Sequence, residues 1–318
     1  MYNTRMIKTK LIRNLFITVL FISPLGVNSD ELDSLADSYI AELESKATGY
    51  VENTAIGVSK SFLEQYFPTV EVTLNLGDPS KPTSGILVVA PLSDPSDIEN
   101  TIFTQLSAFH SDGNRTTLNA GIGYRKLTSD EKLLMGVNAF YDHEFPYDHG
   151  RTSIGLEARS SVGELNMNAY WGTTEWQSGK NGFQEKGLDG MDAEIGIPLP
   201  YMNWAKFYGR AFTWDSEVSG VKDISGSDLS LRADLPFLPG LAMEAGHRNY
   251  NAGIKSENFL RVTYNVTELY RDTPDKPFFS QAAYKLTSMK DKRYDKVRRE
   301  NLIYKQKKAA GRVTVSGF

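Results

Sequence analysis

The residues best suited to chemistry lie close together in the segment DHEFPYDHG, residues 142–150, which contains two histidines and three carboxylates. Imidazole and carboxylate groups at this spacing can ligate a divalent metal or form an Asp/His hydrolytic site. The hydrolytic interpretation would use Asp142, His143, Asp148 and His149. The alternative is a solvated loop between two strands, where any divalent ion would be adventitious. We favour the loop and predict no catalytic or metal site.

Other catalytic chemistry has little support in the sequence. With no cysteine, there is no disulfide, thiolate metal site or cysteine nucleophile. Ser160 and Ser161 lack a nucleophile elbow. The fragment AGIGYR, residues 120–125, alternates like a strand and lacks the strand–turn–helix context of a phosphate loop. We therefore predict a protein that is not an enzyme and has no cofactor.

Charge is distributed unevenly along the chain. Residues 1–29 carry a net charge of +4 and residues 285–312 one of +8, so the rest of this −4 chain carries −16. A basic tail on an acidic body usually indicates nucleic acid or anionic lipid as a partner. The N-terminus argues against nucleic acid, because it has the pattern of an export signal. Four basic residues precede the apolar segment 15–27, and a small-residue cleavage site follows. We interpret residues 1–29 as a signal peptide.

Hydrophobic periodicity changes near Pro68. Before it, residues 30–67 have apolar residues at helical spacing and are predicted to form a helical segment, which we place in the periplasm. After it, apolar and polar residues alternate with period two. We expect about twelve strands, each near the ~10 residues that a tilted strand needs to cross a bilayer. The regular ones are 70–76, 118–125, 133–142, 151–159, 164–171, 191–197, 228–235 and 260–266, and the less regular ones are 84–92, 100–110, 204–214 and 240–250.

The polar face of these strands indicates a membrane barrel. Charged residues and glycines recur on it in strand after strand, as expected of residues that line a lumen, while the apolar face would contact lipid. A soluble β-sandwich is the alternative, with the apolar faces packed together. The export signal, the even strand count and the aromatic residues near strand ends favour the barrel. Short connections near 160–163, 200–203 and 236–239 are expected on the periplasmic side. Longer ones are expected outside near 77–84, 143–150, 174–189 and 215–227.

Several segments resemble motifs of the inverse autotransporter (intimin/invasin) β-domain. LLMGVNAFYDHE (133–144) resembles the family's Gly-Tyr-Asn-x-Phe-x-Asp element, and RTSIGLE (151–157) resembles the strand that follows it. QEKGLDGMD (184–192) resembles its Glu-Arg-Pro-Ala-Asn-Gly-Phe-Asp element. RYDKVRRENLI (293–303) resembles the linker signature after the barrel. The resemblance covers roughly residues 60–308, and the last two elements are its specific parts. The barrel positions that match these and neighbouring motifs are Asn138, Phe140, Asp142, Arg151, Glu157, Asn168, Tyr170, Trp176, Glu185, Gly190 and Asp192, and the linker positions are Arg293, Tyr294, Val297, Arg298, Arg299 and Asn301.

The resemblance implies a twelve-stranded barrel over 68–267, with an N-terminal periplasmic helical segment. It also implies a basic linker, 268–318, that threads the lumen and carries a C-terminal passenger to the cell surface. A basic tail in an acidic lumen would form charge-assisted hydrogen bonds. From the charges we therefore expect Arg293, Arg298 and Arg299 to contact lumen carboxylates. The candidate carboxylates are Glu157, Asp192, Glu194, Asp234 and Glu244.

The predicted function is that of an outer-membrane translocator in type V secretion. Members of the family usually continue into immunoglobulin-like repeats, but this sequence ends at Phe318, shortly after the linker motif. We therefore leave open a truncated gene whose passenger would be C-terminal, a stand-alone translocator that serves a separate passenger protein, and a small-pore barrel with a plug, and we assign no adhesion ligand. The ending VTVSGF alternates, like a first passenger strand or a barrel-assembly signal. Expected partners are outer-membrane lipid, the barrel-assembly machinery and periplasmic chaperones, with a monomeric barrel. The alternatives are a plugged pore or structural barrel without export, and a surface hydrolase.

Overall fold

The computed structural model describes residues 66–76, 83–251, 253–269, 277–309 and 312–316. The predicted signal peptide lies outside these residues, as does the predicted helical segment except for its last two positions. The chain divides into two units, Met1–Lys60 and Ser61–Phe318, and everything described here belongs to the second. In the described residues, none of the helices has the length and apolar character needed to cross a membrane.

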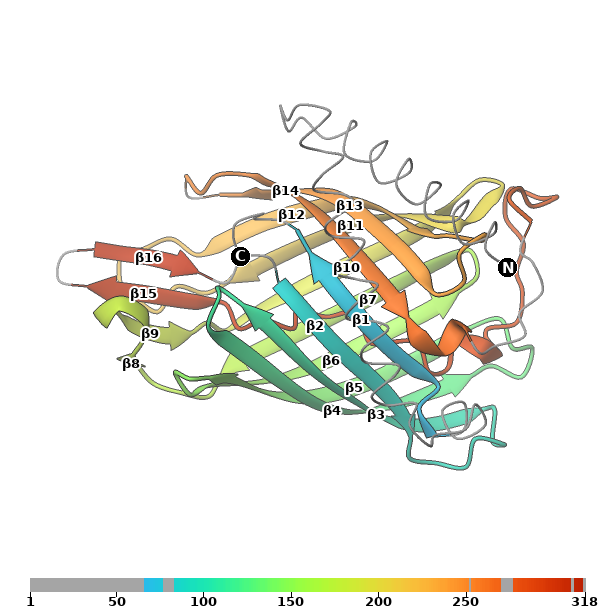
Figure 1. Cartoon of the computed structure of the whole chain (residues 1–318), viewed down its shortest axis with the longest axis horizontal. Coiled ribbons are helices and arrows are strands. Elements are labelled where there is room, and N and C mark those ends of the chain that lie inside the picture. Colours follow the sequence, from blue (N-terminus) through green and yellow to red (C-terminus); the bar gives the residue numbers. More distant parts are fainter. Residues whose placement is uncertain (1–65, 77–82, 252, 270–276, 310–311, 317–318) are drawn as a thin grey trace, which may run out of the picture. The chain divides into compact units, whose positions relative to one another are not determined.

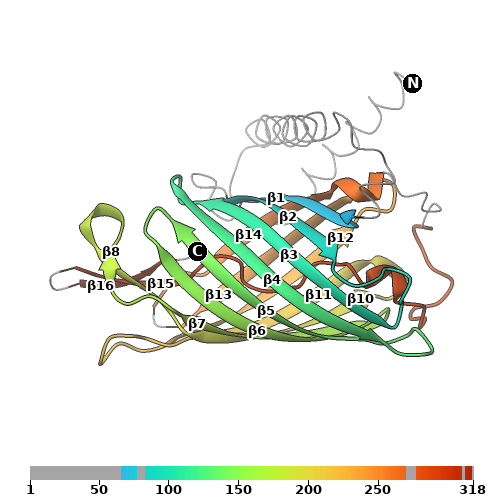
Figure 2. The same cartoon turned by 90° about the horizontal axis from the view of Figure 1, so that it is seen from below.

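Twelve antiparallel strands close into a barrel (Figures 1 and 2). The closure is made by β14 and β1, where Tyr264 lies opposite Val72. All eight regular and all four less regular strands predicted from the sequence are present, so the predicted fold class is confirmed. The barrel strands are β1 (Thr69–Asn75), β2 (Thr83–Pro91), β3 (Asn100–Ser111), β4 (Arg115–Leu127), β5 (Leu134–Phe145), β6 (His149–Ser160), β7 (Gly163–Gly172), β10 (Gly190–Leu199), β11 (Met202–Trp214), β12 (Ile224–Asp234), β13 (Leu241–Tyr250) and β14 (Glu257–Asn265).

The barrel is polar inside and apolar outside. Along β6, Leu156 is 57% exposed on the outer face, whereas its neighbour Glu157 is 6% exposed and points inward. Ile154 and Met191 are also exposed, while Arg125 and Asp142 are buried. Successive side chains of a strand point to opposite faces of the sheet, so the alternation in the sequence becomes an apolar surface around a polar lumen. A sandwich with an apolar core would bury the opposite face.

The connections differ between the two ends of the barrel. We call the end where β1 begins the entry end and the other the exit end. At the entry end the connections contain two to eight residues, the shortest including 161–162 between β6 and β7. At the exit end they contain three to 17, the longest being 173–189 between β7 and β10. One predicted outer loop is wrong. Strands β5 and β6 extend further than expected, so only residues 146–148 connect them, and Asp142, Glu144 and His149 are buried strand residues.

A second, four-stranded sheet lies at the exit end (Figure 1). It combines part of the β7–β10 connection with the C-terminal part of the chain, in the order β16-β15-β9-β8. Residues 313–316 of the ending VTVSGF, for which we considered a first passenger strand or a barrel-assembly signal, form most of β16 outside the barrel. The sequence analysis did not predict the other three strands. The four are β8 (Gln177–Ser178), β9 (Gln184–Gly187), β15 (Lys305–Ala309) and β16 (Arg312–Ser316).

The chain between β14 and β15 passes through the barrel. After η2 (Val266–Leu269), a rim segment, residues 277–289, hydrogen-bonds to three connections at the entry end. These bonds join Ser280 to Tyr201, Thr287 to Ser161 and Met289 to Glu131. A lumen segment, residues 290–304, then starts with the short helix η3 (Lys290–Lys292) and runs inside the ring of strands to the second sheet (Figure 2). Threading of the lumen is thereby confirmed for residues 290–304 of the predicted linker, whereas residues 277–289 lie at the entry end and β15 and β16 lie at the exit end.

Candidate functional site

Barrel arginines hold the lumen segment by its main-chain carbonyl groups. The guanidinium of Arg125 donates to the carbonyl oxygens of Arg293 at 2.7 Å and Asp295 at 2.6 Å. Arg159 donates to the carbonyl oxygen of Lys296 at 2.9 Å. Both arginines are buried and lie on strands that form one wall of the lumen. A rigid, planar guanidinium with several N–H donors suits this role, because one side chain can reach two nearby carbonyl oxygens, as Arg125 does.

The same wall repeats this arrangement closer to the exit end. Arg151 donates to the carbonyl oxygens of Glu300 at 2.7 Å and Leu302 at 2.9 Å. Two asparagine side chains also donate to the lumen segment. Asn119 donates to the carbonyl oxygen of Asn301 at 3.0 Å, and Asn168 donates to that of Arg298 at 3.1 Å. We call these five side chains the carbonyl grip: Asn119, Arg125, Arg151, Arg159 and Asn168. Because every residue has a main-chain carbonyl, the grip contacts the polypeptide without reading its side chains.

Buried carboxylates fix the arginines of the grip. Glu157 accepts from Arg125 Nε at 2.5 Å and forms an ion pair with Arg159 at 2.6 Å. Asp142 forms an ion pair with Arg151 at 2.8 Å. Charges removed from water are stable only when they are paired and hydrogen-bonded. Each carboxylate therefore both neutralises its arginine and orients it toward the lumen segment.

The lumen segment also sends its own cations into the wall. Arg298 pairs with Glu194 (Nη2–Oε2, 2.9 Å) and Glu244 (3.4 Å), as expected from the charges. Arg299 pairs instead with Asp142 at 2.7 Å. Arg293 departs from the expectation, because its guanidinium donates to main-chain carbonyls of the β2–β3 connection, at Asp97 (3.0 Å) and Pro95 (3.4 Å). The other expected carboxylates pair with arginines of the barrel: Glu157 with Arg125, Asp192 with Arg210 and Asp234 with Arg232.

Three apolar contacts accompany these polar ones. Near the entry end, Met289 at the close of the rim segment packs with Leu127 and Leu134. Midway, Val297 packs into a cluster that includes Phe103 and Phe140. At the exit end, the ring of Tyr304 stacks on Trp214 with centroids 4.3 Å apart. The chain is thus anchored at three depths, and its contacts are not confined to one constriction.

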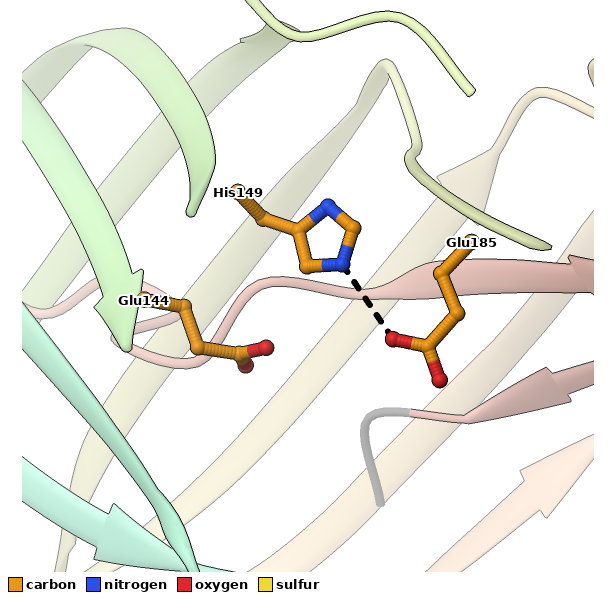
Figure 3. A group of neighbouring side chains, drawn as sticks. All are labelled: Glu144, His149 and Glu185. Carbon is orange, nitrogen blue, oxygen red and sulfur yellow. Dashed lines mark hydrogen bonds and ion pairs between the residues drawn. The ribbon is translucent and has the colours of Figure 1, made fainter. Parts of the chain in front are cut away.

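A buried ionic cluster lies where the lumen segment becomes β15 (Figure 3). Glu144, His149 and Glu185 lie close enough to share a metal ion and are at most 1% exposed. The carboxylates of Glu144 and Glu185 already form ion pairs with basic side chains of the protein. Arg115 pairs with both, at 2.5 Å to Glu144 and 2.9 Å to Glu185, and Lys305 pairs with Glu144 at 2.5 Å.

The histidine of this cluster is also committed to hydrogen bonds. Nδ1 of His149 lies 3.1 Å from the side-chain amide nitrogen of Gln177, which can only donate. Nδ1 therefore accepts, and the Nε2–H donates to Glu185 at 3.2 Å. Burial on its own would raise the pKa of Glu185, but the bond from His149 and the charge of Arg115 together lower it to about 2. This arrangement fits a structural lock better than a metal site.

The four residues of the hydrolytic interpretation do not form one site. Asp142 points inward and is held by Arg151 and Arg299. His143, one position along β5, points to the other face, where it lies 3.3 Å from exposed Asp148. His149 is bonded to Glu185 and Gln177.

The remaining motif residues mostly line the lumen near the exit end. Asp192 accepts from Asn168 and from the hydroxyl of Tyr170, both at 2.8 Å, and that hydroxyl in turn accepts the Glu300 amide at 2.8 Å. Four others contact different parts of the described structure. Trp176 lies 4.0 Å from Lys308 Nζ, Gly190 abuts Trp214, Asn138 flanks Gly155, and the carbonyl oxygen of Tyr294 accepts from Thr69.

The sequence motifs missed several residues of the site, namely Arg115, Asn119, Arg125, Arg159 and Lys305. Three of them lie on β4, on its polar face together with Gly121 and Gly123. The available signal was that alternation, which places Arg125 in the lumen once the strand is known to belong to a membrane barrel.

These features define a transmembrane β-barrel whose lumen is occupied by a later segment of its own chain. The chain belongs to the inverse autotransporter β-domain family, whose model matches residues 23–301. It is an outer-membrane protein of the Gram-negative type, and its apolar outer face fits membrane lipid.

Two curated relatives from Escherichia coli (strain K12) carry names that agree with the family. The inverse autotransporter adhesin YeeJ is 25% identical over 288 residues, which are 88% of this chain and 12% of that protein. The putative attaching and effacing protein homolog is 30% identical over 137 residues, 42% of this chain and 45% of that protein. This chain thus spans less than half of either relative. A membrane protein solved in work on in-meso crystallization has the same fold, with a TM-score of 0.62, 20% identity and coverage of 76% of this chain and all of that one.

Proposed function

We propose that this barrel exports or anchors a polypeptide at the cell surface, and that the basic linker connects barrel and passenger. The carbonyl grip is the observation that supports this most strongly. Arg125 holds the main-chain carbonyls of Arg293 and Asp295 in the turn after η3, and Arg151 holds those of Glu300 and Leu302 further along the lumen segment. An exported polypeptide of any sequence presents the same groups, so such a wall suits a conduit for protein. No step of this role needs catalysis.

In this proposal the entry end faces the periplasm and the exit end faces the medium. The two longest connections, 173–189 between β7 and β10 and 215–223 between β11 and β12, are both at the exit end and support this orientation. Residues 1–29 act as the signal peptide and 30–67 as a periplasmic segment. Sequencing the mature N-terminus tests the first assignment, with Asp30 expected as its first residue. The motif residues, such as Asp142 and Asp192, serve as structural residues of the lumen.

The proposed partners follow from this route. Periplasmic chaperones and the barrel-assembly machinery would deliver the strands to the membrane, and the passenger is either C-terminal or a separate protein. Crosslinking during expression tests for these partners. Adhesion is stated in the name of the relative YeeJ, and we do not extend it to this chain or propose a ligand.

An epitope tag fused after Phe318 tests the proposed export. Antibody should label the tag on intact cells. Two internal tags serve as controls, one in the β11–β12 connection at residues 215–223, expected outside, and one in the β4–β5 connection at 128–133, expected to be labelled only after permeabilisation. If the C-terminal tag behaves like the second control, the tail stays in the periplasm and export is wrong.

A plugged pore is the second candidate, and unfilled space in the lumen favours it. Cavities of about 130 and 160 Å³ remain beside the lumen segment, and the linings of both include residues of β1 and of β11–β14. Both are lined by Tyr208, Lys296 and Arg298, so these side chains separate them. If the barrel is a plugged pore, the tail serves only to fill the lumen. The function would then not require the tag after Phe318 to be labelled on intact cells.

A further inference from the structure

The second sheet suggests a function for the β7–β10 connection that goes beyond linking two strands. Its strand β9 pairs with β15, the first part of the tail beyond the lumen. Gly187 lies opposite Lys305 and Glu185 lies opposite Lys307, and the Leu188 amide donates to the carbonyl oxygen of Tyr304 at 2.9 Å. The exit of the chain is therefore marked by β-strand pairing and not only by side-chain contacts.

The attachments of β9 to the barrel do not involve the tail. Glu185 is fully buried and is held by Arg115 at the start of β4 and by His149 at the start of β6. The neighbouring strand β8 is tied down as well, because the Gln177 side chain donates to the Tyr147 carbonyl oxygen at 2.6 Å. All of these partners lie on the barrel or its connections. The β15-facing edge of β9 is thus held in place by groups that are present before the tail reaches it.

An edge strand fixed in this way is a template for an extended chain, because its free N–H and C=O groups can pair with an added strand. Carboxylates and an aromatic ring around β9 also favour a positively charged segment. Lys305 reaches Glu144 at 2.5 Å and Lys307 reaches Glu185 at 3.5 Å on one face. On the other face Lys308 lies 4.0 Å from the ring centre of Trp176, a cation–π contact.

We propose that β9 is a capture strand for the emerging tail, which binds residues 305–308 as they leave the lumen and opposes their return. The occupant is a basic, extended segment of this same chain. Residues 305–308 can pair with β9 only after they have left the barrel. Once paired, they are held against return into the lumen. Strand β16 then adds to β15, with Gln306 opposite Val315. The inference rests on the proposed export and names the surface that would make export directional.

Proline at Lys186 isolates the backbone pairing from the side chain. In an antiparallel ladder, hydrogen-bonded and non-hydrogen-bonded residue pairs alternate. Since Leu188 donates to Tyr304, the next hydrogen-bonded pair on β9 is Lys186 with Gln306. Lys186→Pro removes the amide that faces β15, while Lys186→Ala keeps it and removes only the ion pairs to Glu175 and Glu217. Gln306→Pro and Gln306→Ala form the same matched pair on the tail.

The experiment uses the full chain with the tag after Phe318, and follows the rate at which the tag becomes accessible on intact cells. A shift in gel mobility on heating verifies that each barrel has folded. We expect both proline variants to slow the appearance of the tag roughly fivefold to tenfold relative to their alanine partners, as the loss of one net hydrogen bond suggests. Purified folded protein should also become more sensitive to trypsin after Lys307 and Lys308 when either proline is present.

Equal rates and equal trypsin sensitivity in the proline and alanine variants would overturn the capture strand. The proposal would also fail if a proline variant and its alanine partner both slowed tag appearance, relative to the unsubstituted chain, by the same factor. The lost side chain, and not the strand pairing, would then explain the slower rate. A failure of the export proposal looks different, since the tag of the unsubstituted chain would itself never label on intact cells. If Lys186→Pro prevents folding of the barrel, Gln306→Pro decides the question from the tail side.

Discussion

At the scale of single residues, the lumen works through carboxylates that each serve two cations. Asp142 pairs with Arg151 of the barrel and with Arg299 of the lumen segment, and all three side chains are fully buried. Glu157 likewise joins Arg125 and Arg159. Asp142 thus connects the wall to the lumen segment directly, whereas Glu157 connects two wall arginines that hold carbonyls of the segment. Removing such a carboxylate leaves two buried cations without a counter-charge, which is more costly than losing a simple pair.

Asp142→Asn should therefore destabilise the folded barrel strongly. We expect the free energy of unfolding in detergent micelles, measured by denaturant titration, to fall by about 3–5 kcal/mol. Asp148→Asn, in the same hairpin, is the matched control. Its partner is His143 and its side chain is 71% exposed, so its loss should cost about 0–1 kcal/mol. Similar losses for the two variants would contradict the assignment of Asp142 as a shared counter-ion.

The buried cluster of Glu144, His149 and Glu185, which we call the exit lock, should depend on pH through Glu185. Its pKa is lowered from 4.5 to about 2 in the folded protein, through His149 and Arg115 acting against burial. A carboxyl group with a depressed pKa contributes stability that is fully present above pH 4.5 and is lost as the pH falls toward 2. The protection factors of the β9 and β15 amides, which correct exchange for its intrinsic pH dependence, should accordingly stay high at pH 5 and fall between about pH 4 and 2.

The matched variant for that measurement is Glu185→Gln, which cannot ionise. It should exchange faster at neutral pH and lose the acid-dependent component. A protection profile that is flat from pH 5 to 2 in the unsubstituted protein would show that the charge of Glu185 does not hold the lock.

At the scale of elements, β4 depends on glycines that make room for aromatic rings. The ring of Phe103 lies across Gly123, where an added Cβ would be 2.3 Å from a ring carbon. Phe140 covers Gly121 in the same way. These rings belong to the strands on either side of β4, and they also form the apolar cluster that receives Val297. The glycines thus shape the wall against which the lumen segment packs.

Gly123→Ala should push Phe103 out of this position and lower the unfolding free energy by about 1–3 kcal/mol, the usual cost of overpacking. Gly163→Ala is the control, because its added Cβ would meet only the carbonyl oxygen of Gly196 at 3.6 Å, an ordinary contact. The same detergent titration measures both. If the two variants are equally stable, the ring has room to move and the close approach is not a constraint.

The barrel elements were predictable because a strand with one face in lipid must alternate in the sequence. Each of the twelve could be located, even where the pattern was weaker, as in β11 and β13. The second sheet was not predictable in this way. Strands β8 and β9 are two and four residues long, too short for a period, and their pairing with β15 depends on where the tail emerges. The loop expected at 142–150 failed for a related reason, since buried ion partners from distant strands let polar residues extend β5 and β6.

At the scale of the whole molecule, the lumen segment completes the barrel electrostatically. Its cations neutralise wall carboxylates at three points, Lys296 with Glu71, Arg298 with Glu194 and Arg299 with Asp142. Its carbonyls occupy the donors of the grip in return. The wall and the segment are thus one bonded unit, and the state of the pore follows from whether residues 290–304 are present, not from the tail beyond them.

Two truncations separate these contributions. A chain that ends at residue 289 keeps the rim segment but loses the lumen segment, and in planar bilayers it should give a higher single-channel conductance than the full chain. That pore should prefer cations, because Glu71, Asp142 and Glu194 lose the positive charges that they face. A chain that ends at Tyr304 keeps the lumen segment and loses β15 and β16, so its conductance should remain that of the full chain. A large open pore in the second truncation would mean that the pairing on β9, and not the bonding inside the lumen, keeps the barrel closed.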